Sequence, residues 1–307
     1  MAFPRQAMTI AERRLERPGL QFVRLRIDWL PYLLLLPTVI FLSAFFVYPM
    51  LQALALSVRG PDGALTWRYF QAMVGDTYFI GAIRNSLLLT AIVIPLQVTL
   101  ALTIALLVHS RFRGHTTFLY VAAIPLGISD LAAGLVWLSI FTERGYLNML
   151  LQGLHLVPRP LTFLTFERPL LLYGAIVATE VWRATAIVML ILVAGLQLIP
   201  REFFETAEVF GATGWRKLRH VTLPLLRPVL QTALIIRTIL AFQLFATVIT
   251  LAGRIVPVLA GEAYFQYTIY RNPHVASAYA VLIMGTSMAV TVLYLRLLRT
   301  PEEVARA

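Results

Sequence analysis

The chain has 307 residues, of which 59% are hydrophobic and 13% are charged, and its mean hydropathy is +0.77. A soluble protein of this length is nearer half apolar and about a quarter charged, so the composition excludes an ordinary soluble domain and predicts an integral membrane protein. The net charge of +11 does not indicate nucleic-acid binding, because the basic residues are spread between apolar runs and form no separate basic domain.

A basic leader and six apolar runs follow one another along the chain. Residues 1–28 carry six arginines and are expected to stay in the cytoplasm. Each apolar run reaches the roughly 20 residues that cross a bilayer. The predicted spans are 30–58, 85–108, 118–141, 170–198, 229–251 and 275–298. We therefore predict an all-α, multi-pass membrane domain over 29–298 with about six transmembrane helices, and a cytoplasmic tail at 299–307.

The orientation of the spans follows from their flanking charges. Sixteen Arg and Lys residues fall in the segments that six spans would leave in the cytoplasm, and eight fall in the outer segments. Basic residues are enriched in cytoplasmic loops, so both termini are predicted to be cytoplasmic. The outer segment 255–270 is broken by Pro257 and Gly261 and is expected to be a loop with a short helix at most.

A charged stretch, 200–224, interrupts the apolar runs between the fourth and fifth spans. Pro200 can begin a helix, because the first turn needs no N–H from it. Three glutamates then recur at every third position and share one helical face, with apolar residues opposite. Gly211 permits a bend or a close approach to another backbone. An ordinary cytoplasmic loop with a surface helix is the alternative interpretation.

The order of residues in this stretch resembles the EAA loop of the permease subunits of binding-protein-dependent ABC importers. That pattern reads Glu-Ala-Ala, three residues, Gly, nine residues, Ile, one residue and Leu-Pro. The residues that match it at this spacing are Glu205, Ala207, Gly211, Leu223 and Pro224. Thr206 replaces the first Ala of the pattern, and Val221 replaces its Ile.

Six spans with this loop between the fourth and fifth are similar to the carbohydrate-uptake branch of these importers, in particular the maltose-type large subunit and the glycerol-3-phosphate-type permease. The resemblance implies the type I importer permease fold in a bacterial or archaeal cytoplasmic membrane. It implies a second permease subunit in a heterodimer, two ATP-binding subunits that hold ATP and magnesium, and an extracytoplasmic solute-binding protein. The residues it implies for coupling to the ATPase are Glu205, Thr206, Ala207, Glu208, Phe210, Gly211, Leu223 and Pro224.

No pattern in the chain indicates enzymatic chemistry. There is no phosphate-binding loop that ends in Gly-Lys-Ser/Thr, so ATP hydrolysis is expected in a partner. The five histidines are scattered without metal-like spacing, and there is no cysteine, so neither a metal nor another cofactor is expected on this chain.

Polar residues inside the spans have two possible roles, since a buried charge normally faces the protein interior or a wet cavity. In the structural interpretation, Glu180 and Arg183 form an internal ion pair, and Arg237 lies near the cytoplasmic end of its span. In the functional interpretation, these spans line a hydrophilic path for a hydroxyl-rich solute. The residues predicted for that path are Glu180, Arg183, Phe242 and Gln243.

The leading hypothesis is a permease subunit for a sugar or sugar-like solute. A phosphorylated polyol or phosphodiester such as glycerol-3-phosphate is the alternative cargo, because Arg183 and Arg237 suit phosphate recognition. A stand-alone secondary carrier is a third hypothesis, although paired repeats with broken helices, which such carriers show, are not visible in the sequence.

Overall fold

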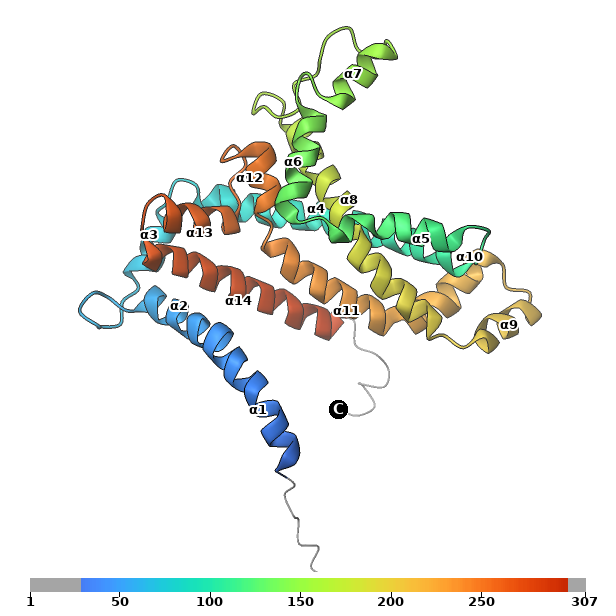
Figure 1. The fold of residues 1–307 in the computed structure, drawn as a ribbon, viewed down its shortest axis with the longest axis horizontal. Helices are drawn as coiled ribbons and strands as arrows, with labels where there is room; N and C mark the ends of the chain where they lie inside the picture. Colours follow the sequence, from blue (N-terminus) through green and yellow to red (C-terminus); the bar gives the residue numbers. More distant parts are fainter. Residues whose placement is uncertain (1–28, 298–307) are drawn as a thin grey trace, which may run out of the picture. The chain divides into compact units, whose positions relative to one another are not determined.

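The structure is a computed structural model that describes residues 29–297 (Figure 1). These residues form helices joined by loops, and among them the isolated bridge between Arg59 and Leu65 is the one strand-like pairing. The chain divides into two compact units, of which the first ends at Met50 and the second begins at Leu51. The terminal segments 1–28 and 299–307, predicted to be cytoplasmic, lie outside the described residues.

The first unit is helical from Leu30 onward. It comprises α1 (Leu30–Leu42), the π-helical turn η1 (Ser43–Val47) and the beginning of α2 (Tyr48–Val58). No side chain of α1 is buried, although the helix is almost wholly apolar. An apolar, exposed surface on every side of a helix is typical of a segment surrounded by lipid, so the predicted first span is present as a helix.

Long helices dominate the second unit. They are α4 (Phe79–His109), α8 (Pro169–Gln197), α11 (Leu223–Phe242) and α14 (Pro273–Leu297). Helix α4 packs along α8, and α11 contacts α4, α8 and α14 (Figure 1). Ala101 and Ala105 of α4 are fully buried in the core that also holds Leu192 of α8. Small residues four apart let two helix backbones approach closely, which is how membrane helices pack.

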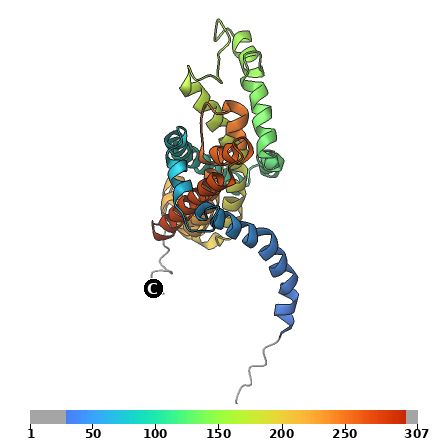
Figure 2. The ribbon, with the colours of Figure 1, turned by 90° about the vertical axis from the view of Figure 1, so that its left-hand side faces the viewer.

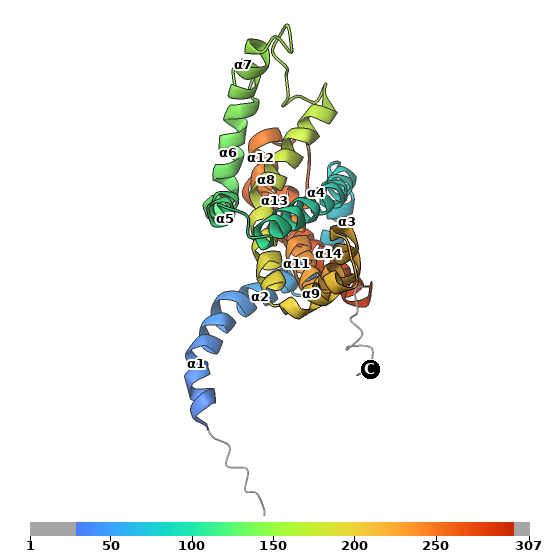
Figure 3. The same cartoon turned by 90° about the vertical axis from the view of Figure 1, so that its right-hand side faces the viewer.

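The third predicted span is present as a bent pair of helical segments and not as one continuous helix. It is divided into α5 (His115–Ala123), the 3-10 turn η2 (Ile124–Gly127) and α6 (Asp130–Phe141), which leads to α7 (Tyr146–Gly153). The segments before and after the break are bent by 102°. In Figure 2 and Figure 3, α6 (green) leads directly to α7 after the break.

Local sequence explains this break. Pro125 lacks an N–H for the helical ladder, and Ile128 is extended with ψ of 126°. Ser129 then begins a new helix, because its side-chain oxygen accepts a hydrogen bond from the Ala132 N–H at 3.2 Å. The described residues hold five helical segments able to cross a membrane, or six if the bent pair counts as one span, in agreement with the predicted fold class.

The fifth predicted span is also interrupted. Helix α11 ends at Phe242, and a second helix, α12 (Ala246–Ala252), begins after a short break. No Pro or Gly lies in the break, so we attribute it to tertiary contacts, since α12 packs against α6 and α8. The short helix allowed in the following segment is present as α13 (Leu259–Thr268).

Arg254 fixes the segment between α12 and α13. Its Nη2 donates to Glu262 Oε2 at 2.6 Å, its Nη1 donates to the Tyr270 hydroxyl at 2.7 Å, and its guanidinium lies 3.7 Å from the centre of the Tyr78 ring. Desolvation acts to lower the pKa of Arg254, but hydrogen bonds with Glu262 and Tyr270 outweigh it and raise that pKa above its usual value. The guanidinium is therefore charged at any physiological pH and holds this loop against the start of α4.

Candidate functional site

The charged stretch after α8 folds into a helical hairpin. Helix α9 (Arg201–Val209) starts after Pro200, as the sequence predicts, and carries Glu202 in its first turn, where an acid suits the helix dipole. A turn connects α9 to α10 (Gly214–Lys217), the π-helical turn η3 (Leu218–Thr222) and α11. The whole stretch thus links two long membrane helices, α8 and α11.

A Schellman turn ends α9. The Gly211 N–H donates to the Glu208 carbonyl at 2.9 Å, and the Ala212 N–H donates to the Ala207 carbonyl at 2.9 Å. This motif needs a residue in the left-handed region, and Gly211 has φ of +72°. The predicted bend at Gly211 is confirmed, and its cause is the absence of a Cβ at a position where one would strain the backbone.

An ion pair closes the hairpin. Lys217 Nζ of α10 donates to Glu208 Oε1 of α9 at 2.7 Å. Ala207 and Pro224 line one groove between α9 and the beginning of α11. The two ends of the matched pattern therefore meet in space, which gives a structural reason for the spacing between them.

The outer face of the hairpin is exposed. Glu205, Thr206 and Glu208 are solvent-accessible, and the Phe210 side chain is 84% exposed. Ala207 alone among the α9 residues is buried. An exposed aromatic ring directly after a helix that carries exposed glutamates is a surface suited to a protein partner.

A buried ionic network lies within the long helices. Glu180 of α8 and Arg237 of α11 are 0% and 1% exposed, and Arg237 Nη2 lies 3.0 Å from Glu180 Oε2. The same carboxylate oxygen lies 3.2 Å from Arg183 Nη2. Arg183 Nη1 in turn lies 2.7 Å from Asp130 Oδ1, at the start of α6. Two arginines and two carboxylates balance one another, which such a buried site requires.

Neutral side chains complete the network. The Thr247 hydroxyl of α12 donates to Glu180 Oε1 at 2.7 Å. The side-chain amide of Gln97 in α4 donates to the Glu180 carbonyl at 2.7 Å, and its oxygen accepts a hydrogen bond from Arg237 Nε. Five helices are thereby joined through one centre: α4, α6, α8, α11 and α12.

Comparison with known proteins identifies the family. Residues 97–300 match the model of the binding-protein-dependent transport system inner membrane component. The sulfoquinovosyl glycerol transport system permease protein SmoG of Agrobacterium fabrum is 32% identical to this chain, with 89% of this chain and 91% of SmoG covered. The trehalose transport system permease protein SugA of Mycobacterium tuberculosis is 29% identical, with 96% of this chain and 92% of SugA covered. The chain belongs to this family.

The fold of the permease agrees with that assignment. A chain in the crystal structure of a bacterial ABC transporter involved in the import of the acidic polysaccharide alginate superimposes with a TM-score of 0.76. The alignment covers 89% of this permease and 96% of that chain at 21% identity, and so supports the fold alone. The protein is a multi-pass inner membrane component of a binding-protein-dependent transporter and therefore a transport protein.

The four residues predicted to line a solute path in the permease are not equally accessible. Glu180 and Phe242 are buried, the latter at 2% exposure, whereas the Arg183 side chain is 18% exposed. Gln243 is exposed and lines a groove between α11 and α14. The structure brings Glu180 and Arg183 together, as predicted, and places Gln243 in the separate groove.

Some partners were missed or misplaced in the sequence interpretation. The structural interpretation placed Arg237 near the cytoplasmic end of its span and named no partner for it, whereas the structure pairs Arg237 with Glu180 in a buried contact. The Asp130–Arg183 pair and the role of Thr247 were not predicted. Charge balance among Asp130, Glu180, Arg183 and Arg237 was the available signal, since buried charges need partners.

Proposed function

We propose that this permease forms half of the translocation path for a sugar or sugar-like solute in an ATP-driven importer. The relatives SmoG and SugA, named for sulfoquinovosyl glycerol and trehalose transport, support a carbohydrate cargo. A second permease subunit would form the other half of the path. Two ATP-binding subunits would hold ATP and magnesium, and an extracytoplasmic binding protein would deliver the solute.

The α9–α10 hairpin is our candidate contact with an ATP-binding subunit, and the single observation that carries this proposal is its exposed yet braced geometry. Its outer residues Glu205, Thr206 and Phe210 are free to enter a partner's groove. The Schellman turn and the Lys217–Glu208 ion pair hold α9 against α10. A displacement of α9 would therefore be transmitted to α8 and α11. The arginine asymmetry of the sequence favours a cytoplasmic position for this hairpin.

The ionic network does not favour a phosphorylated cargo. Arg183 and Arg237 are the residues that favoured phosphate, but each of them is paired with a carboxylate. Arg183 Nε and Arg237 Nη1 have no hydrogen-bond partner among the described residues, but an anion that reached them would be repelled by the nearby carboxylates of Glu180 and Asp130. Of the predicted path residues, Arg183 and Gln243 remain our candidates for solute contact, with Glu180 and Phe242 supporting them from behind.

The variant Gly211→Asp tests the coupling proposal. An aspartate would strain a position with φ of +72° and add a negative charge at the turn, so we expect solute uptake to be lost while the amount of membrane-inserted protein is unchanged. Gly214→Asp is the matched control, because Gly214 begins α10 with no positive φ, and an acid suits a helix start. Normal uptake by Gly211→Asp in cells would contradict the proposal.

The cargo is tested separately with the partner binding protein. A thermal-shift screen of that protein should show stabilisation by neutral sugars and none by their phosphate esters. Stabilisation by glycerol-3-phosphate alone would reject the sugar and leave the coupling proposal unaffected.

A further inference from the structure

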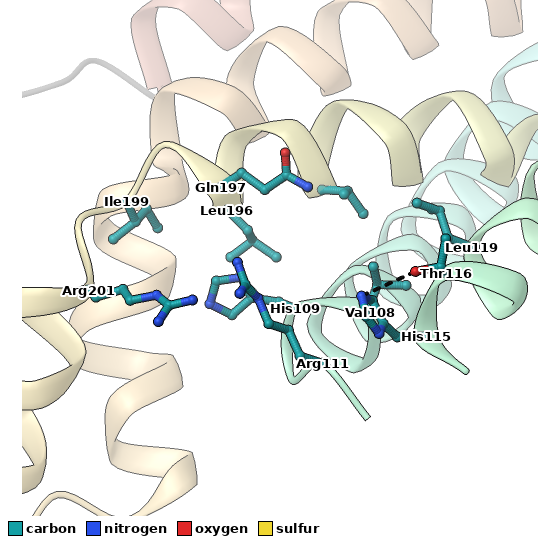
Figure 4. A pocket seen from close by; sticks show the side chains of 11 residues that line it. Val108, His109, Arg111, His115, Thr116, Leu119, Leu196, Gln197, Ile199 and Arg201 are labelled. Atoms are coloured by element: carbon teal, nitrogen blue, oxygen red, sulfur yellow. Dashed lines mark hydrogen bonds between the residues drawn. The ribbon is translucent and has the colours of Figure 1, made fainter. Parts of the chain in front are cut away.

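A basic pocket lies where four segments of the second unit meet. It has a volume of about 360 Å³ and is formed by the end of α4, the beginning of α5, the end of α8 and the beginning of α9 (Figure 4). The polar residues that line it are His109, Arg111, His115, Thr116, Gln197 and Arg201. None of its lining residues is acidic.

Two arginines converge in this pocket without a counter-charge. In Figure 4 the side chains of Arg111 and Arg201 both reach toward the His109 ring. Within residues 29–297, no carboxylate lies within ion-pair distance of either guanidinium. Like charges brought together repel one another, and a bound anion would remove that repulsion.

The backbone conformation at Arg111 sets the direction in which its side chain leaves the end of α4. Arg111 has φ of +53°, in the left-handed region that a residue with a Cβ rarely adopts. His155 and Arg271, which also follow helix ends, have the same left-handed conformation, so it belongs to the end of α4 and does not by itself indicate a ligand. In this pocket the guanidinium of Arg111 converges on that of Arg201, and neither has a carboxylate partner among the described residues.

The rest of the pocket is apolar. The side chains that form this part are Val108, Leu119, Val193, Leu196 and Ile199. A free phosphate ion would gain nothing from these groups, whereas a phospholipid can place its phosphate on the arginines and its glycerol and first acyl carbons on the apolar wall. The site also lies at the ends of two membrane helices, α4 and α8, and the ends of such helices lie close to the lipid headgroups.

We propose that this pocket binds the phosphate group of an acidic phospholipid. Arg111 and Arg201 would hold the phosphate, as basic pockets between membrane helices hold acidic headgroups. Arg201 is the first residue of α9, and the His109 ring of α4 lies 5.4 Å from the Phe204 ring of α9, tilted by 45°. The lipid would therefore bridge the α4–α5 loop and the start of the α9–α10 hairpin. This position is distinct from the outer face of that hairpin and from the buried ionic network.

Native mass spectrometry of the full-length chain in detergent tests this proposal. Phosphatidylglycerol, phosphatidylcholine and inorganic phosphate are added in separate titrations. We expect retention of phosphatidylglycerol over phosphatidylcholine, and roughly fivefold weaker phosphatidylglycerol binding in each of the variants Arg111→Gln and Arg201→Gln. Arg113→Gln is the matched control, because Arg113 is exposed in the same loop and does not line the pocket.

Each other outcome has a defined meaning. Equal retention of both lipids by the wild-type chain would overturn the proposal, as would equal loss in Arg113→Gln and Arg111→Gln. Displacement of phosphatidylglycerol by millimolar inorganic phosphate, with the same dependence on Arg111 and Arg201, would overturn the lipid as ligand and assign the pocket to a soluble phosphate. Thermal unfolding of each variant without lipid separates a binding defect from a folding defect.

Discussion

The α9–α10 hairpin and the buried ionic network use the same kinds of side chain in opposite ways. In the hairpin, Glu208 and Lys217 form one partly exposed pair, and the remaining acids face solvent. In the network, Glu180 is wholly buried and contacts two arginines, a threonine and, through its carbonyl, Gln97. Water screens the first set and leaves it available to a partner. In the second set Glu180 and Arg237 are out of contact with water and have only protein groups as partners, so the geometry of the network restricts how its five helices pack.

The effect on the free energy of unfolding should differ most between the two regions when a carboxylate is removed from each. Glu180→Leu leaves Arg237 buried without a counter-charge, so we expect a loss of about 3–5 kcal/mol in the free energy of unfolding. Titration with SDS in mixed micelles measures this quantity. Glu205→Leu removes an exposed acid from α9 and should change it by about 0.5 kcal/mol or less.

A double variant checks that the cost arises from an unpaired charge. In Glu180→Leu/Arg237→Met neither buried ion remains, and Arg183 keeps its contact with Asp130. We expect the double variant to recover more than half of the stability lost by Glu180→Leu. Additive losses would show that the pair itself stabilises the fold, and the comparison between the two regions would then need another cause.

The second prediction concerns the neutral part of the network. Gln97→Met keeps the volume of the side chain but leaves Arg237 Nε and the Glu180 carbonyl without their partner. We expect a loss of about 1–3 kcal/mol by the same SDS titration, because buried polar groups lose hydrogen bonds that no water replaces. Gln71→Met, at an exposed position in α3 (Arg68–Val74), is the matched control and should have little effect. Equal stability of the two variants would mean that water reaches the network.

The third prediction applies to the turn of the hairpin. Gly211→Ala places a Cβ at φ of +72° with nothing within 4 Å to obstruct it, so its cost is backbone strain alone. That cost should be about 1 kcal/mol and should appear as faster amide exchange in α9, with the exchange of α8 unchanged. Gly214→Ala, at an equally open position without positive φ, should leave exchange in α9 unaltered.

Local signals made the hairpin predictable. Pro200 before the helix, the glutamates on one face and Gly211 at the turn act within a few residues of one another, so the helix start and the bend followed from the sequence. The network differs because its partners are distant: Gln97 and Arg237 are 140 residues apart. Sequence reasoning identified the buried charges and their need for partners, but the pairs depend on how the helices pack.

The third span shows that a local signal can also be overlooked. Pro125, Gly127 and Ser129 stand within the apolar run 118–141, which was predicted as one span from its length and composition. Their combined effect, a lost N–H, a flexible residue and a helix cap, bends the chain and brings Asp130 to the first turn of α6. That break is what lets Asp130 meet Arg183. Hydropathy therefore predicted the existence of the span, and turn chemistry determined which charge entered the network.

The smallest expected effect concerns the Lys217–Glu208 pair. Its side chains are 26% and 61% exposed, so solvent and salt weaken the attraction between them. Glu208→Gln should reduce the free energy of unfolding by about 0.5 kcal/mol at low ionic strength and by less at 1 M salt.

Asp130→Asn is the informative comparison, because Asp130 is similarly exposed at 58% but its partner Arg183 is 18% exposed and also contacts Glu180. A larger and less salt-sensitive loss in Asp130→Asn would show that the covered partner, and not the exposed carboxylate, decides the strength of an ion pair. Equal salt dependence in both variants would place Asp130 with the solvent-screened charges of the hairpin and restrict the network to Gln97, Glu180, Arg183, Arg237 and Thr247.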